Sequence, residues 1–315
     1  MHIVLAEPLG ITETALRNLA SPFIAQGHTF VSYPDKAADD ATLAQRLCDA
    51  DIALIANRPL PESVLKSCPR LQYINVAFTG VDHVAMDYCR ERRIPVSNAA
   101  GYSDQTVAEL TIGFAVALLR RLPACDSAVR TGGTSAALRG GEIAGRTVGV
   151  IGLGRIGRRT AKLFEAFGAQ VITCDPDEKA AEAGYPMVFL DELLSTADIV
   201  TLHAPSNAST RKMLGKEQFA LMKPTGYFIN CARGALVDSG ALCDALNRGV
   251  IAGAAVDVFD LEPPLPASEP LLQAKNCILA PHVAYLSDES MLRRAQIVFD
   301  NLAAYLRGTP QNLCR

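Results

Sequence analysis

A glycine-rich turn in the middle of the chain constrains the fold more than any other feature. Residues 152–157 read Gly-Leu-Gly-Arg-Ile-Gly, directly after the apolar run 147–151 and at the start of a helical stretch, 155–167. In such a turn the first glycine permits a tight bend, the second lets the backbone approach a ligand, and the third lets the helix pack closely on the strand. The segment therefore predicts a strand, turn and helix of a parallel α/β sheet.

The same turn predicts a site for a dinucleotide, because the amide groups and positive partial charge of a helix N-terminus suit a pyrophosphate. Asp175 ends the next predicted strand, about 20 residues farther on, where a carboxylate accepts hydrogen bonds from the adenosine ribose and repels a 2'-phosphate. This position favours NAD over NADP. The alternative is an aspartate that starts a turn before Pro176. The cofactor candidates in this motif are Gly152, Gly154, Arg155, Ile156, Gly157 and Asp175.

Short β-type runs alternate with helical stretches on both sides of a long apolar helix, 104–122. This rhythm predicts an α/β protein with two doubly wound parallel sheets. The amphipathic helix 288–306 follows the second sheet, so we expect it to return to the first domain. The prediction is a Rossmann NAD-binding domain, 99–285, inserted in a discontinuous flavodoxin-like domain. The predicted strands are 2–6, 29–32, 52–56, 71–76, 148–151, 170–174, 199–202, 227–229, 252–256 and 277–280.

Composition argues against several other classes of protein. The net charge of -3 gives no general attraction for nucleic acid or anionic lipid. The apolar run 110–119 is too short to span a bilayer, and the run 3–6 lacks the basic segment of a signal peptide. The 9 cysteines are scattered without a C-x-x-C pair, which indicates neither a metal site nor a disulfide framework. We therefore expect a cytoplasmic protein with no metal, nucleic acid or membrane partner.

Three charged or titratable residues, Arg233, Glu262 and His282, lie at the ends of predicted strands of the second domain or in the loops that follow. Ligands of open α/β sheets bind at this end of the strands. The planar fork of an arginine binds a carboxylate, and a glutamate beside a histidine stabilises the protonated form of a general acid/base. Together they suit the reduction of a keto acid. Taken singly, they are also explained as a surface ion pair, a solvated loop acid and a turn residue after proline.

The order of motifs resembles the D-isomer-specific 2-hydroxyacid dehydrogenase family over essentially the whole chain. This resemblance implies an NAD-dependent enzyme that transfers a hydride between nicotinamide and the 2-carbon of a small 2-hydroxy or 2-keto acid. The matching segments are Gly80-Val81-Asp82, Val107-Ala108-Glu109, the glycine turn with Asp175, His203-Ala204-Pro205 with Thr210, residues 230–234, Asp257-Val258-Phe259 leading to Glu262-Pro263, and Pro281-His282.

The resemblance also implies roles for single residues. Arg233 binds the carboxylate and carbonyl of the substrate, His282 donates or accepts the proton, and Glu262 orients His282. Backbone amides at Thr79 and Gly80 hold the substrate carboxylate. The residues 99–285 then form the NAD-binding domain, and 1–98 with 286–315 form the substrate domain. The arm 123–145 resembles the dimer-forming region of the family, which predicts a homodimer. Further implied cofactor contacts are Thr106, His203, Ala204, Pro205, Thr210, Cys231, Ala232 and Asp257.

The chain departs from the family at Phe78, where many relatives have a glycine. Phe78 and Tyr285 are candidates to line the pocket for the substrate side chain, and the alternative is that both pack between the domains. The pair Arg293-Arg294 is expected on a solvated helix face. Cys231 adjoins the arginine motif, yet the family resemblance makes it a backbone contact and not a nucleophile.

Two rival functions remain open on the sequence. The first is a nucleotide-sensing binding module, as in relatives of the co-repressor type, because fold does not fix function. The second is a family member that acts on formate or phosphite. The set of Arg233, Glu262 and His282 favours catalysis over the first, and Glu262 before a proline argues against formate.

Overall fold

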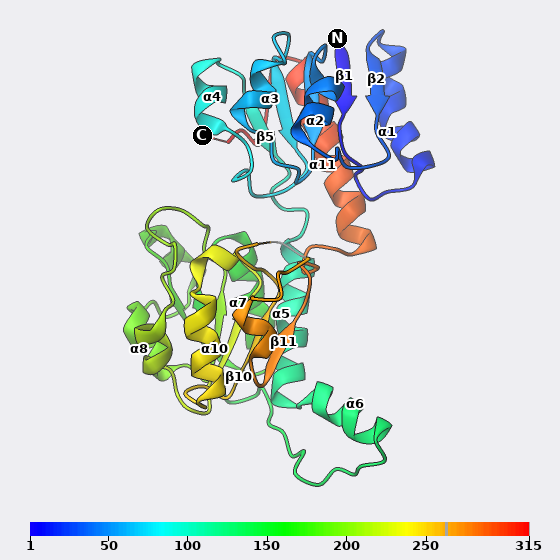
Figure 1. Ribbon diagram of the computed structural model, residues 1–315. Helices are drawn as coiled ribbons and strands as arrows, with labels where there is room; N and C mark the ends of the chain where they lie inside the picture. Colours follow the sequence, from blue (N-terminus) through cyan, green and yellow to red (C-terminus); the bar gives the residue numbers. More distant parts are fainter. Residues whose placement is uncertain (262–263, 315) are drawn as a thin grey trace. The chain divides into compact units, whose positions relative to one another are not determined.

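The computed structural model describes residues 1–261 and 264–314, and the chain folds as two compact units (Figure 1). Unit 1 comprises Met1–Ser103 and Leu286–Arg315, and unit 2 comprises Asp104–Tyr285. The chain therefore leaves unit 1 once, completes unit 2, and returns to unit 1 with its last long helix.

The described residues of unit 1 form a parallel sheet in the order β2-β1-β3-β4-β5, which is the flavodoxin-like order (Figure 1). The helices α1 and α11 pack beside one another, and so do α2 and α3. The strands β3 and β4 are buried at every position because helices cover both faces of the sheet. The elements are β1 His2–Leu5, α1 Glu13–Ala25, β2 Thr29–Ser32, α2 Asp40–Leu47, β3 Ile52–Ile55, α3 Glu62–Lys66, β4 Tyr73–Val76, α4 Met86–Glu91, β5 Val96–Asn98 and α11 Asp288–Leu306.

The described residues of unit 2 form a second parallel sheet, in the order β11-β10-β9-β8-β6-β7. One buried cluster joins the sheet to α5 and α7, and another joins its opposite face to α8, α9 and α10. Met187 forms an isolated parallel bridge to Thr173 and extends the sheet beyond β7, as a third strand does in a Rossmann fold. The elements are α5 Asp104–Leu119, α6 Leu122–Arg130, β6 Thr147–Ile151, α7 Arg155–Ala166, β7 Gln170–Cys174, α8 Leu190–Thr196, β8 Ile199–Leu202, α9 Lys216–Leu221, β9 Tyr227–Asn230, α10 Ser239–Asn247, β10 Gly253–Val256 and β11 Cys277–Leu279.

The predicted fold, two doubly wound parallel sheets, is confirmed, although several elements were not foreseen. Strand β5 has only three residues, too few for a periodic signal. Helix α6 begins at Leu122, one residue before the expected arm 123–145, and has no buried residue. Helix α1 continues past Pro22, which has no N–H to donate to the carbonyl oxygen of Asn18. The Ser21 hydroxyl donates to this oxygen instead. None of the helices in the described part of the chain is long and apolar enough to cross a membrane.

The arginine pair on α11 corrects one prediction. Arg293 is exposed as expected, but Arg294 is only 4% exposed and its guanidinium group donates to the carbonyl oxygen of Leu9. The prediction of a solvated helix face was wrong for Arg294, because neighbouring positions on one helix point to different sides and a charged residue was assumed to face water.

Candidate active site

Most of the predicted site residues of unit 2 that the structure describes lie at one edge of its sheet. All pairs of neighbouring strands are parallel, so their carboxyl ends meet at the same edge. This edge is where ligands bind in open α/β sheets. In strand order across the sheet, the ends carry His282 after β11, Asp257 after β10, Cys231 to Arg233 after β9, His203 after β8, the glycine turn after β6 and Asp175 after β7.

The three glycines of the turn have three different environments. Gly152 has a φ of +89°, and a Cβ added to it would lie 2.7 Å from the backbone nitrogen of Ala204. A Cβ added to Gly157 would lie 2.0 Å from the carbonyl oxygen of Gly152. Gly154 has an ordinary φ of -67° and nothing within 4 Å of the added Cβ. The outer two glycines are therefore required by the protein itself, and the middle one leaves open space.

This open space fits a pyrophosphate. Gly154 is the N-cap of α7, and no side chain caps the first turn of that helix. The first amides of an α-helix have no partner within the helix and favour an anion. The turn is braced from both sides: the carboxylate of Asp175 accepts the N–H of Leu153 at 2.6 Å, and Arg158 Nε donates to the Leu153 carbonyl oxygen at 2.9 Å. The residues present therefore fit a dinucleotide.

The side chain of Arg155, predicted as a cofactor contact, is paired with α5. Its Nε donates to a carboxylate oxygen of Asp104, on α5, at 2.8 Å. Thr106 lies on the first turn of α5, one residue beyond Gln105, whose side chain is paired with Arg159 of α7. These contacts hold α5 beside α7.

The segment after β8 forms a closed loop. The Thr210 hydroxyl donates to the carbonyl oxygen of Pro205 at 2.7 Å and accepts the N–H of Asn207 at 2.9 Å. His203 Nε2 is hydrogen-bonded to the Thr201 hydroxyl at 2.9 Å. Burial lowers the pKa of His203 to about 4, so its imidazole is neutral at pH 7. A neutral His203 suits a packing role beneath the glycine turn better than a role as a cation.

The loop that carries Arg233 is held by Asn230, a buried residue to which the sequence alone gives no role of its own. The Asn230 side-chain oxygen accepts the N–H of Ala232 at 3.0 Å, and its Nδ2 donates to the carbonyl oxygen of Arg233 at 3.0 Å. The next residue, Gly234, packs against the loop after β10, since an added Cβ would lie 2.0 Å from the carbonyl carbon of Phe259. The backbone of Arg233 is thus fixed on both sides, which limits the positions that its side chain can reach.

The loop that carries His282 is held by Asp257, which is fully buried. The two carboxylate oxygens of Asp257 accept the N–H groups of Val283 and Ala284, each at 2.8 Å, and its carbonyl oxygen accepts the N–H of His282 at 2.8 Å. His282 itself has a left-handed φ of +55°, and its ring packs edge-on against Tyr285 with centroids 5.4 Å apart. Asp257, which was predicted as a cofactor contact, thus also braces the His282 loop.

Glu262 lies outside the described residues. Among the residues that the structure does describe, no group of three or more potential ligands could hold a metal ion. The predicted substrate residues of unit 1 follow β4: Thr79 is exposed, and its carbonyl oxygen accepts a hydrogen bond from the Asn98 side chain at 2.7 Å. Phe78 and Gly80 are partly buried in the same loop.

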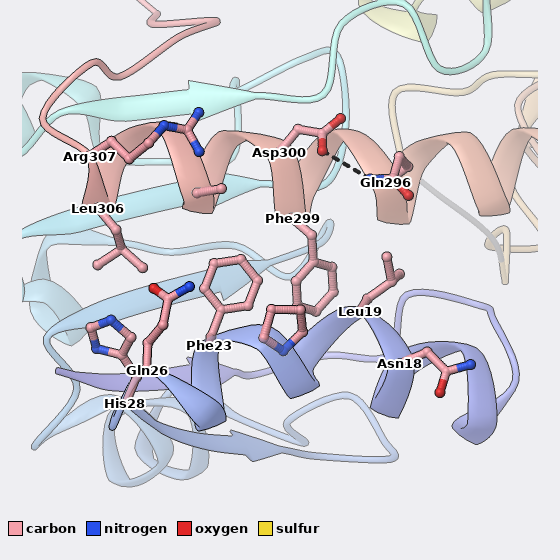
Figure 2. A pocket seen from close by; sticks show the side chains of 12 residues that line it. Asn18, Leu19, Phe23, Gln26, His28, Gln296, Phe299, Asp300, Leu306 and Arg307 are labelled. Atoms are coloured by element: carbon pink, nitrogen blue, oxygen red, sulfur yellow. Dashed lines mark hydrogen bonds between the residues drawn. The ribbon is translucent and has the colours of Figure 1, made fainter.

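A groove of about 440 Å³ lies away from these residues, between α1 and α11 of unit 1. Figure 2 shows Phe23 and Phe299 side by side on its floor, with Gln26, His28 and Arg307 toward one end. None of the predicted site residues lines it. It is therefore separate from the candidate site.

Cys231 is unsuited to covalent chemistry. Burial, aided by the negative charge of Asp257, raises the pKa of its thiol to about 12. The thiolate is the reactive form, and at pH 8 it is a negligible fraction. We expect iodoacetamide at pH 8 to leave Cys231 unlabelled in the native protein while it labels the exposed Cys48, as measured by peptide mass spectrometry. Rapid labelling of Cys231 before unfolding would contradict this assignment.

Comparisons with known proteins show which family the chain resembles. Residues 112–284 match the family model for the D-isomer specific 2-hydroxyacid dehydrogenase, NAD binding domain. The chain is 36% identical over 275 residues to a glyoxylate reductase of Korarchaeum cryptofilum, which covers 84% of this chain and 82% of that protein.

Two solved structures are similar over nearly the whole chain. An acyclic imino acid reductase in complex with NADPH and D-Arg has a TM-score of 0.91 at 27% identity, with 100% of both chains covered. D-lactate dehydrogenase from Aquifex aeolicus, complexed with NAD and lactic acid, has a TM-score of 0.84 at 29% identity, with 98% of this chain and 96% of that one covered. The predicted family, the enzyme class and the nicotinamide cofactor are confirmed by these matches. The chain belongs to the D-isomer specific 2-hydroxyacid dehydrogenase family.

Proposed function

We propose that the protein is an NAD-dependent dehydrogenase that interconverts a small D-2-hydroxy acid and the corresponding 2-keto acid. One observation carries the proposal: the glycine turn, Arg233 and His282 lie at the carboxyl edge of one parallel sheet. A dinucleotide turn, a carboxylate-binding arginine and a general acid/base are the parts that this reaction needs. The names of the similar proteins, a glyoxylate reductase and a D-lactate dehydrogenase, support a small acid as substrate.

In this proposal unit 2 holds the cofactor. The amides at the start of α7 bind the pyrophosphate above Gly154, and Asp175 accepts hydrogen bonds from the adenosine ribose while its other contacts brace the turn. The loop closed by Thr210 and the segment around Cys231 line the remainder of the site. When bound, the reduced nicotinamide supplies the hydride.

The chain's own residues bind the acid and move the proton. Arg233 binds the carboxylate of the keto acid with its guanidinium group, and the backbone amides at Thr79 and Gly80 contribute to the same carboxylate. His282 Nε2 or Nδ1 donates a proton to the carbonyl oxygen during reduction and accepts it back during oxidation. Glu262 orients His282. In this proposal residues 1–98 and 286–315 form the substrate domain, and 99–285 form the NAD-binding domain.

The test is NADH oxidation, followed by absorbance, with 2-keto acids from glyoxylate, pyruvate and hydroxypyruvate to branched and aromatic members. The panel is repeated with NADPH and with an added amine, because one similar structure is an imino acid reductase. NADH-dependent turnover of a keto acid without amine supports the proposal. NADH binding without turnover of any member would overturn it in favour of a nucleotide-sensing module or an acceptor such as formate or phosphite.

We also propose that two copies of the chain form a homodimer through the arm that contains α6. This helix has no buried residue although it carries Leu122 at 49% and Val129 at 76% exposure. Leu122 and Val129 are seven positions apart, about two helical turns, so they share one face of α6, and apolar side chains gathered on one exposed face suit contact with another chain. The arm adjoins a cavity of about 510 Å³ lined in part by Arg121, Arg139 and Tyr227.

The variant carrying Leu122→Asp and Val129→Asp is expected to be a monomer, because a buried unpaired carboxylate is unfavourable in an interface. Light scattering after size exclusion measures the mass of each species. Phe189→Asp, at a position 86% exposed outside the arm, serves as the control and should remain a dimer. A double variant with the same mass as a dimeric wild type would reject the arm as the interface.

A further inference from the structure

Arg294 is a buried cation that joins three loops of unit 1. It lies on α11 and is 4% exposed, and its Nη2 donates to the carbonyl oxygen of Leu9 at 2.6 Å. The centre of its guanidinium group lies 4.9 Å from the ring centroid of Phe78 and 5.9 Å from that of Tyr102. Leu9 follows β1, Phe78 follows β4 and Tyr102 follows β5, so all three loops lie at the carboxyl edge of the first sheet.

The packing around this guanidinium group is close. A Cβ added to Gly10 would lie 3.3 Å from Met291 Sδ and 3.5 Å from Arg294 Nη2. The rings of Phe78 and Tyr102 meet edge to face, with centroids 6.0 Å apart and an interplanar angle of 82°. A cation over an aromatic face is attracted by the ring quadrupole, and the attraction is stronger when water is excluded. The Phe78 ring therefore contacts both a cation and the Tyr102 ring.

The Phe78 ring adds a constraint that the backbone contacts of its loop do not supply. The Phe78 carbonyl oxygen accepts the N–H of Ala99 at 2.9 Å, and Asn98 donates to the Thr79 carbonyl oxygen. The first contact ties the loop to the segment after β5. The second ties it to Asn98, the last residue of β5, whose carbonyl oxygen accepts the side chain of Asn301 on α11 at 2.9 Å. The contact with Arg294 adds a direct link from α11 to the Phe78 side chain.

We propose that Arg294 is a positioning residue for substrate binding: through Phe78 it fixes the loop 78–80, so that the amides of Thr79 and Gly80 are preorganised for the carboxylate of the acid. This rests on the proposed function. A glycine at position 78 would leave the backbone of this loop free. Phe78 and Arg294 together order the loop instead. Preorganisation lowers the entropy lost on binding, so its loss raises KM more than it lowers kcat.

The test compares Arg294→Met with Phe78→Leu, the variant that combines both, and Arg307→Met, an exposed arginine at the end of the same helix. Arg294→Met keeps the length and apolar stem and removes the cation. We expect KM for the keto acid to rise about tenfold in Arg294→Met, because the loop must then be ordered when the substrate binds. The kcat and the Kd of NADH should stay nearly unchanged. The combined variant should raise KM no more than the single variant with the larger effect does, because the two residues act as one pair. Arg307→Met should behave as wild type.

Amide hydrogen exchange of the peptide that contains residues 78–82 tests the clamp independently of activity. Faster exchange of this peptide in Arg294→Met, together with wild-type exchange in Arg307→Met, supports the clamp. Equal exchange in the wild type, Arg294→Met and Arg307→Met overturns it. Faster exchange with an unchanged KM overturns the role in substrate binding. A wild type that turns over no keto acid refutes the proposed function and with it the substrate role, while the exchange result still decides whether Arg294 fixes the loop.

Discussion

Replacing His282 with asparagine is expected to lower kcat for keto acid reduction by about 10²- to 10⁴-fold, the usual contribution of a general acid/base. Asparagine tolerates the left-handed φ of +55° at this position, and its N–H still donates to the Asp257 carbonyl oxygen. The loop after β11 should therefore keep its conformation, and the variant should retain the wild-type Tm and Kd for NADH. Steady-state kinetics, thermal unfolding and NADH fluorescence titration measure the three quantities.

The control for this variant is His28→Asn, which replaces a histidine of unit 1 that is hydrogen-bonded to the N-terminal amino group of Met1 and lies outside the candidate site. It should leave kcat unchanged. Turnover by His282→Asn within a factor of two of wild type would reject His282 as the proton donor. A loss of activity accompanied by a lower Tm or weaker NADH binding would instead indicate damage to the loop.

The edge of the second sheet was predictable because strand ends are marked in the sequence. The runs at 147–151, 170–174 and 199–202 are short and mostly apolar, and each is followed directly by a glycine or a polar residue, namely Gly152, Asp175 and His203. Parallel pairing then brings these followers together without any knowledge of side-chain contacts. The glycine turn was predictable for the same reason, since only glycine fits at Gly152 and Gly157.

The braces of the site could not be predicted from the sequence. Asp257 accepts N–H groups from residues 26 and 27 positions away, and nothing local marks which amides a buried carboxylate will face. Asn230 lies within a segment that the sequence singled out, 230–234. Its role as a brace has a local signal, because an asparagine at the end of a strand often accepts the N–H of the residue two positions farther on. The burial of Arg294 could not be predicted, because a charged residue on an amphipathic helix is expected to face solvent. Three loops of unit 1 contact its side chain instead.

The prediction with the sharpest control concerns the middle glycine of the turn. Gly154→Ala is expected to raise the Kd of NADH by about 10- to 100-fold, because the added methyl group occupies the space through which the backbone approaches the pyrophosphate. Tm should stay within about a degree of wild type. The reason is that nothing in the protein lies within 4 Å of the new Cβ and the φ of -67° suits alanine.

Two other glycine variants separate ligand exclusion from structural damage. Gly113→Ala, on α5, also places its Cβ in open space, so it should change neither the Kd of NADH nor Tm except for a small gain from helix propensity. Gly157→Ala places its Cβ 2.0 Å from the Gly152 carbonyl oxygen, so it should weaken NADH binding and also destabilise the fold by about 1 to 3 kcal/mol. If Gly154→Ala binds NADH as tightly as Gly113→Ala does, the pyrophosphate does not lie over the middle glycine, and the cofactor assignment of this turn is wrong. If instead Gly154→Ala loses stability as Gly157→Ala does, the open space above Gly154 is filled by the protein and not by the ligand.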